Sequence, residues 1–176
     1  MLLKKLHHVA YRCADAQETV EFYTKLLGLK FAKAIVQDYV PSIKKHYPHT
    51  HIFFEMEDGS FIAFFDLLHE KPAQADPNTP SWVQHLALEV SDMPTMLAAK
   101  KRLEDAGVEV LGPVNHHFCQ SIHFFDPSGH RLEMSVRTEP PGYMEKSANE
   151  AWSILEQWNA KKRAVGQSAR EPAPAK

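Results

Sequence analysis

Hydrophobic and polar positions alternate in two stretches that lie far apart in the chain and resemble each other. They read HVAYRCAD over residues 8–15 and HLALEVSD over residues 85–92. Each begins with His, alternates as a half-buried strand does, and ends with Asp, a preferred N-cap of a following helix. The two stretches therefore predict two copies of a strand that leads into a helix.

The same order of elements continues after both strands. Residues 16–29 and 93–110 place apolar side chains at helical spacing, and Gly28 and Gly107 stand at the expected C-caps. Strand patterns follow each helix, at about residues 30–37, 48–57 and 60–68 in the first half and 108–112, 115–125 and 130–137 in the second. Each half is thus predicted to be a βαβββ module.

This repeat organises residues 1–140 as one domain of two modules. The modules span about residues 5–68 and 83–138, and the Pro-rich, polar stretch 69–82 is the predicted linker. Residues 141–176 predict one helix and a polar, Ala- and Pro-rich tail that is expected to be disordered. Three apolar residues of that helix have helical spacing, and we expect them to pack on their own domain rather than on a partner chain or over a functional site: Trp152, Leu155 and Trp158.

Alternation also decides which side chains point away from the helices. Leu132 and Met134 take the helix side of their strand, so Glu133 faces the other way, as His8 and His85 do in the first strands of the two modules. Because the modules repeat, both histidines can meet Glu133 if the two sheets close on each other. Two neutral imidazoles and a carboxylate make a metal site, which would offset the cost of burying Glu133. The alternative for each residue alone is an ordinary polar strand position.

Four stretches together make the chain resemble a known family: HHVAYRCAD, EFYTKLLGL, HLALEV and FFDPSGHRLEM. Over about residues 5–138 the chain resembles the vicinal oxygen chelate superfamily, which includes glyoxalase I, extradiol catechol dioxygenases, methylmalonyl-CoA epimerase, and fosfomycin-resistance and bleomycin-binding proteins. The resemblance implies an α+β, glyoxalase/dioxygenase-like fold, in which two βαβββ modules form a curved, open sheet cup around a divalent metal. By position, it makes His8, His85 and Glu133 the metal ligands. The fourth position falls on Ala63, where glyoxalase I and the epimerase have an acidic residue.

The segment that ends at Glu133 is similar to that of single-domain type I extradiol dioxygenases. It matches their pattern from Val114 onward, except that His123 replaces a tyrosine. The resemblance implies Fe(II), which suits two His and one carboxylate with open positions, with Mn, Zn, Ni or Co as alternatives. It makes His123 and His116 the candidate catalytic residues, since a histidine can donate a hydrogen bond or move a proton near neutral pH. The candidate substrate-pocket residues with cup-facing parity are Phe61, Phe65, Phe125 and Arg12.

These features predict a metal-dependent extradiol-type ring-cleavage dioxygenase, an oxidoreductase that takes a catechol-like or other vicinal-oxygen substrate and O₂. One alternative is a lyase or isomerase of the glyoxalase and epimerase type, but that chemistry needs a base beside the metal and Ala63 removes the usual one. The other is a non-catalytic, ligand-sequestering resistance protein, which the complete ligand set disfavours.

Composition narrows the class of protein further. The net charge is −2 with no long basic run, so we expect no nucleic-acid partner, and the longest apolar runs are too short for a membrane span. Cys13 and Cys119 lie far apart and form no CxxC, which favours a reduced, cytoplasmic chain. The eleven histidines favour metal or proton chemistry. Resemblance to family members of this length implies a homodimer.

Overall fold

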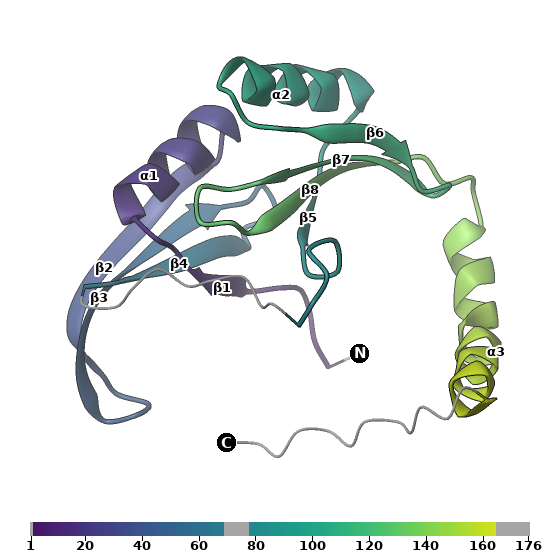
Figure 1. Cartoon of the computed structure of the whole chain (residues 1–176), viewed down its shortest axis with the longest axis horizontal. Helices are drawn as coiled ribbons and strands as arrows, with labels where there is room; N and C mark the ends of the chain where they lie inside the picture. The colour runs from purple at the N-terminus through teal and green to yellow at the C-terminus, as the bar shows by residue number, and fades with distance from the viewer. Residues whose placement is uncertain (1, 69–77, 165–176) are drawn as a thin grey trace.

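The secondary structure of the computed structural model follows the sequence repeat through both modules (Figure 1). The structure describes residues 2–68 and 78–164, so most of the predicted linker and the tail expected to be disordered lie outside the described residues. The first module contains β1 (His8–Arg12), α1 (Ala16–Glu21), the π-helical turn η1 (Phe22–Leu26), β2 (Lys30–Val40), β3 (Lys45–Glu55) and β4 (Phe61–Leu67). The second contains β5 (Leu86–Glu89), α2 (Met93–Asp105), β6 (Leu111–Asn115), β7 (Cys119–Phe125) and β8 (Arg131–Arg137).

The predicted helix caps are confirmed in both modules. The carboxylate of Asp15 accepts a 2.8 Å hydrogen bond from the backbone N–H of Glu18 at the start of α1. The carboxylate of Asp92 accepts a 2.8 Å hydrogen bond from the backbone N–H of Thr95 at the start of α2. Gly28 follows the first helical segment with φ +76°, a left-handed conformation that favours glycine at a helix end. The first helix differs from the prediction in one respect, because the chain changes from α-helical to π-helical geometry after Glu21.

Each module contributes one four-stranded sheet, with the strand orders β1-β4-β3-β2 and β5-β8-β7-β6. The first strand of each module pairs in parallel with the last strand of that module, which is therefore an inner strand. In the second sheet this places Glu133 of β8 between Ala87 of β5 and His123 of β7. The register thus brings the strand of Glu133 next to β7, which carries His123, and next to β5, which begins one residue after His85.

Both sheets bury their helix-facing sides in a single apolar core. The core includes fully buried side chains from the first sheet, the second sheet and the helical segments: Phe54, Phe64, Phe124, Leu132, Tyr23, Met96 and Leu103. The helical segments α1–η1 and α2 contact each other beside this core, where the guanidinium Nε of Arg102 donates a hydrogen bond to the carbonyl of Leu26. The predicted alternation is confirmed, since Met134 is buried on the helix side.

The predicted C-terminal helix forms as α3 (Tyr143–Ala164), but its apolar face does not pack on the domain as expected. Trp152 is 76% exposed and Trp158 is 51% exposed. The helix is attached at its start, where the ring of Tyr143 stacks on Phe118, and it then extends away from the sheets (Figure 1). Helical spacing correctly predicted that these residues share one face of a helix. Which surface that face contacts depends instead on where the helix begins and in which direction it runs. Among the described residues, no helix is long and apolar enough to cross a membrane.

Candidate metal centre

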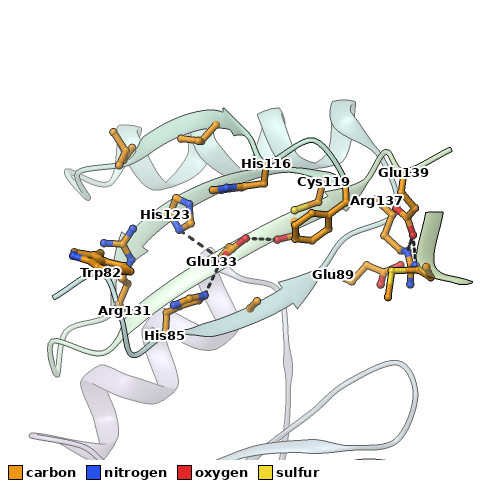
Figure 2. A pocket seen from close by; sticks show the side chains of 16 residues that line it. Trp82, His85, Glu89, His116, Cys119, His123, Arg131, Glu133, Arg137 and Glu139 are labelled. Atoms are coloured by element: carbon orange, nitrogen blue, oxygen red, sulfur yellow. Dashed lines mark hydrogen bonds and ion pairs between the residues drawn. The ribbon is translucent and has the colours of Figure 1, made fainter. Parts of the chain in front are cut away.

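A cavity of about 770 Å³ lies against the face of the second sheet that points away from the core (Figure 2). Its volume is in the range of small-molecule sites. The side chains that line it include His85, His116, His123 and Glu133, with Glu89, Arg131, Arg137 and Glu139 further along the same cavity. Its apolar walls include Trp82, Phe118 and Met144. The cavity therefore combines apolar walls with several polar and charged side chains, as ligand sites usually do.

Glu133 lies at the centre of this polar group and is only 7% exposed. Its Oε1 accepts hydrogen bonds from the hydroxyls of Ser121 and Ser135, the latter at 2.7 Å. Burial by itself raises the pKa of Glu133, but these two hydrogen bonds and the nearby histidines lower it below its ordinary value. The carboxylate is therefore ionised, with Oε1 satisfied by the serines and Oε2 directed at the histidines.

His85 presents a defined nitrogen to that carboxylate. Its Nε2 lies 3.1 Å from Oε2 of Glu133, and its Nδ1 lies 3.1 Å from the backbone carbonyl of Val83. A carbonyl only accepts, so Nδ1 donates and carries the proton. Nε2 is then the nitrogen available to a metal, and the Val83 carbonyl fixes the ring as partners of metal-ligating histidines commonly do.

His123 and His116 bring two further nitrogens to the same place. Figure 2 shows His123 and His85 approaching Glu133 from either side, with Nδ1 of His123 3.8 Å from Oε2 of Glu133. Nδ1 of His123 and Nε2 of His116 are buried and have no hydrogen-bond partner within the described part of the chain. One donor atom from each of His116, His123 and Glu133 lies within 4.8 Å of the others. Burial lowers the pKa of His123 despite the opposing effect of Glu133, so its ring is neutral at pH 7.

These donors fit a divalent metal ion. Imidazole nitrogen and carboxylate oxygen are the ligands of mononuclear iron, manganese and zinc sites. Buried imidazole nitrogens without a hydrogen-bond partner are costly, and a bound cation would satisfy them. The face of the second sheet is therefore suited to hold a metal at Oε2 of Glu133.

His8 lies elsewhere, on the sheet of the first module. Its Nδ1 is 2.7 Å from Nδ1 of His7, and its ring centroid is 6.1 Å from that of Phe53. Within residues 2–68 and 78–164, no hydrogen bond, ion pair or ring contact joins His8 to His85 or Glu133. The structure thus brings two of the three predicted ligands together in one chain and places the third on the other sheet.

The predicted substrate-pocket residues also lie outside the cavity around Glu133. Phe61 and Phe65 belong to the first sheet, where Phe65 stacks on His51 with ring centroids 3.7 Å apart. Phe125 lines a neighbouring cavity of about 610 Å³. Arg12 contributes its backbone carbonyl, which accepts a 2.7 Å hydrogen bond from Nε2 of His130.

Ala63, where the resemblance implied a fourth ligand position, has a fully buried side chain. Asp66, the nearest carboxylate along that strand, has the opposite parity and accepts a hydrogen bond from the backbone N–H of Ala16 at the start of α1. No carboxylate of β4 therefore faces the side of the sheet on which His8 lies.

Several residues of the site were not predicted. Ser121 and Ser135 have the same strand parity as His123 and Glu133, so alternation contains the signal that identifies them. Trp82 and Met144 lie on segments outside the strands, and no local pattern predicts that these segments border the cavity.

Comparison with curated proteins finds two informative relatives. MhqA of Bacillus subtilis (strain 168), provisionally named a ring-cleaving dioxygenase, is 29% identical over 146 residues, which cover 81% of this chain and 43% of MhqA. The chain thus spans less than half the length of that relative. The glutathione transferase FosA of Serratia marcescens is 26% identical over 139 residues, covering 77% of this chain and 82% of FosA.

Comparison with solved structures confirms the predicted fold. A glyoxalase/bleomycin resistance protein/dioxygenase domain from Frankia sp. EAN1pec matches with a TM-score of 0.64 at 19% identity, covering 77% of this chain and 99% of that one. The fosfomycin resistance protein FosX of Listeria monocytogenes, solved with Mn(II) and sulfate, matches with a TM-score of 0.55 at 17% identity, covering 78% and 95%. The model of the family described as Glyoxalase/Bleomycin resistance protein/Dioxygenase superfamily matches residues 5–134. The two βαβββ modules, the shared fold and this match together place the chain in that superfamily, to which it belongs.

Proposed function

We propose that the chain is a metal-dependent, extradiol-type ring-cleavage dioxygenase that acts on a catechol-like or other vicinal-oxygen substrate with O₂. The observation that carries the proposal is the approach of His85 Nε2 to within 3.1 Å of Glu133 Oε2 in a cavity that also has apolar walls. Two histidines and one carboxylate are the ligands of non-haem iron oxygenases. The similarity to MhqA supports the same class of reaction.

The proposed metal ligands are His85 and Glu133 of one chain and His8 of a second copy. Within one chain the helix-facing sides of both sheets share a core, so their opposite faces, which carry His8 and Glu133, are left free to meet another molecule. His8 is exposed, as a residue that completes a site across an interface must be before assembly. In a homodimer in which the first sheet of one copy covers the second sheet of the other, His8 and His85, the equivalent histidines of the two modules, would both lie beside Glu133.

When bound in this site, a divalent metal such as Fe(II) supplies Lewis-acid and redox chemistry toward a substrate with two adjacent oxygens and toward O₂. The protein positions the flat substrate between the apolar walls at Trp82 and Phe118. The neutral imidazole of His123 stands where the extradiol pattern has a tyrosine and can take a proton from a substrate hydroxyl. His116, whose Nε2 is buried in the same cavity, is the second proposed proton-transfer group. We include a cytoplasmic location in the proposal, because both cysteines are free thiols.

An anaerobic reconstitution experiment tests this function. The purified chain is loaded with Fe(II), Mn(II) or Zn(II) and added to a panel of catechols in an oxygen electrode, while product absorbance is recorded. We expect oxygen uptake with the Fe(II) protein that depends on the catechol. His85→Ala should abolish both uptake and iron binding, whereas the matched variant His46→Ala, at an exposed position of β3, should retain both.

A second candidate function is metal-dependent group transfer without O₂. It is favoured by FosA, because the match covers 82% of that relative but only 43% of MhqA. The same experiment separates the candidates. Metal binding with no oxygen uptake on any catechol would contradict ring cleavage and favour group transfer, and no binding of any metal would favour a ligand-sequestering protein.

A further inference from the structure

We infer that the substrate carries a carboxylate, which the guanidinium of Arg131 binds at one end of the cavity. The inference rests on the proposed function and deepens it, because it narrows the catechol-like or other vicinal-oxygen substrate to an acidic one. Arg131 is then a substrate-binding residue that determines specificity, and it takes no part in holding the metal. Its position, its unpaired guanidinium and the charges at the other end of the cavity each support this role.

Arg131 lies one step along the strand from the candidate metal centre. It is the first residue of β8 and shares the cavity-facing side of that strand with Glu133. Two residues on the same side of a strand are about 6.7 Å apart, and the long arginine side chain extends this reach. Figure 2 shows Arg131 at the end of the cavity near Trp82, with Glu133 further toward the middle. A flat substrate that lies along the strand with its two oxygens beside Glu133 therefore has its far edge within reach of Arg131.

The guanidinium of Arg131 is unpaired within the described part of the chain. Its Nε is buried without a hydrogen bond, and no described carboxylate forms an ion pair with it. Glu133 does not balance its charge, because that carboxylate contacts the hydroxyls of Ser121 and Ser135 and the ring of His85 instead. A buried donor without an acceptor is costly, and arginine binds a carboxylate through two parallel N–H groups. A substrate carboxylate would satisfy both the charge and the donor.

The charges at the opposite end of the cavity have the other sign. There Arg137 is ion-paired with Glu139, and Glu89 adds a second carboxylate, so these three side chains together carry a net negative charge. Figure 2 shows this group beyond Glu133 on the side away from Arg131. Such a distribution of charge favours one orientation of an acidic substrate, with its carboxylate at Arg131 and away from Glu89.

Calorimetric titration tests the inference without turnover. Protocatechuate, a catechol with one carboxylate, and its neutral amide are titrated anaerobically into the protein with and without Zn(II). We expect wild type to bind the acid at least about 10-fold more tightly than the amide, and Arg131→Gln to bind the two within about twofold of each other. Arg131→Lys, which keeps the charge, should retain part of the preference, and the control Arg163→Gln, at an exposed position of α3, should retain all of it. Equal affinity for acid and amide in wild type, binding of neither, or an unchanged preference in Arg131→Gln would overturn the inference.

Kinetics of the Fe(II)-loaded protein separate this inference from the proposed function. We expect Arg131→Gln to raise KM for the acid by about 10-fold or more, with kcat within about threefold of wild type and no change in KM for the amide. Cleavage of acid and amide with equal kcat/KM in wild type would overturn the inference and leave the proposed function intact. A preference for the acid that depends on Arg131, without oxygen uptake on any catechol, would contradict ring cleavage alone. Loss of the preference in Arg137→Gln but not in Arg131→Gln would assign the carboxylate to the other end of the cavity and overturn the inference.

Discussion

The hydroxyl of Tyr23 donates a 3.0 Å hydrogen bond to the carboxylate of Asp126 and thereby joins the two modules. Both groups are buried, and burial raises the pKa of Asp126 and the pKa of Tyr23 above their ordinary values. Asp126 begins the turn that leads into β8, the strand of Glu133. The hydrogen bond thus fixes the first module against the turn beside the candidate metal centre.

We expect Tyr23→Phe to lower the free energy of unfolding by about 1–3 kcal/mol, since it leaves a buried carboxyl oxygen without its partner. Urea denaturation measures the change. Tyr39→Phe is the matched control, because this ring is 49% exposed and its substitution should change stability by less than about 0.5 kcal/mol. Equal stability of the two variants would contradict the role assigned to the Tyr23 hydroxyl.

The serines behind Glu133 should control how metal binding depends on pH. In Ser121→Ala the carboxylate of Glu133 loses a hydrogen bond that lowers its pKa. Glu133 is then protonated at a higher pH than in wild type, and the proton competes with the metal for the carboxylate oxygen at that higher pH. We expect Co(II) affinity to fall about 10- to 100-fold at pH 6 and by less at pH 8. Ser153→Ala on α3 is the control and should keep the wild-type dependence of Co(II) affinity on pH. The same pH dependence in Ser121→Ala as in Ser153→Ala would refute the prediction.

The stability of the metal-free protein should decrease in acid because of His51. Burial lowers the pKa of His51 from 6.5 to about 4. Between these values the unfolded chain binds more protons than the folded one, so the free energy of unfolding falls as pH decreases from 6.5 to 4. After allowance for solvent screening of this partly exposed ring, the effect is on the order of 1 kcal/mol.

Replacement of His51 by Phe, which keeps a ring beside Phe65, should flatten the pH dependence of stability over this window. Urea denaturation at pH 4.5 and pH 7 gives the slope. The exposed His46, replaced by Phe in the same way, should leave the slope as in wild type. An unchanged slope in His51→Phe would show that other groups cause the acid sensitivity.

The exposure of α3 predicts that its aromatic residues contribute little to folding of the chain. Trp152→Ala should change the free energy of unfolding by less than about 0.5 kcal/mol. By contrast, Phe124→Ala should lower it by about 3–5 kcal/mol, because Phe124 is 1% exposed and contacts Phe22 in the shared core. Thermal denaturation at low protein concentration compares the two. A large loss in Trp152→Ala would mean that α3 packs on the domain after all.

Strand alternation predicted most of what one sheet shows. The period of two placed Glu133 opposite the buried Leu132 and Met134, and placed His85 on the side of its own strand that faces away from the helices. These relationships are local, since each depends only on the register of neighbouring strands. The same rule places His123 on the face of Glu133, because the two residues pair across β7 and β8.

Strand alternation and the repeat did not predict how the two sheets are placed relative to each other. The repeat assigns His8 and His85 equivalent places in their modules, but it contains no information on how the modules pack. The shared core around Tyr23 is formed by contacts between residues far apart in the chain, and such contacts determine how the two sheets lie relative to each other. The direction of α3 likewise depends on the stacking of Tyr143 on Phe118.

The two hydroxyls that occupy Oε1 of Glu133 determine its denticity. With that oxygen already accepting from Ser121 and Ser135, the carboxylate can offer an ion only Oε2 and takes one coordination position instead of two. In the proposed centre, one such carboxylate and two imidazoles would leave the other positions of the metal to exogenous ligands. Two serines that are not themselves ligands would therefore limit how many exogenous atoms the proposed metal could bind at once.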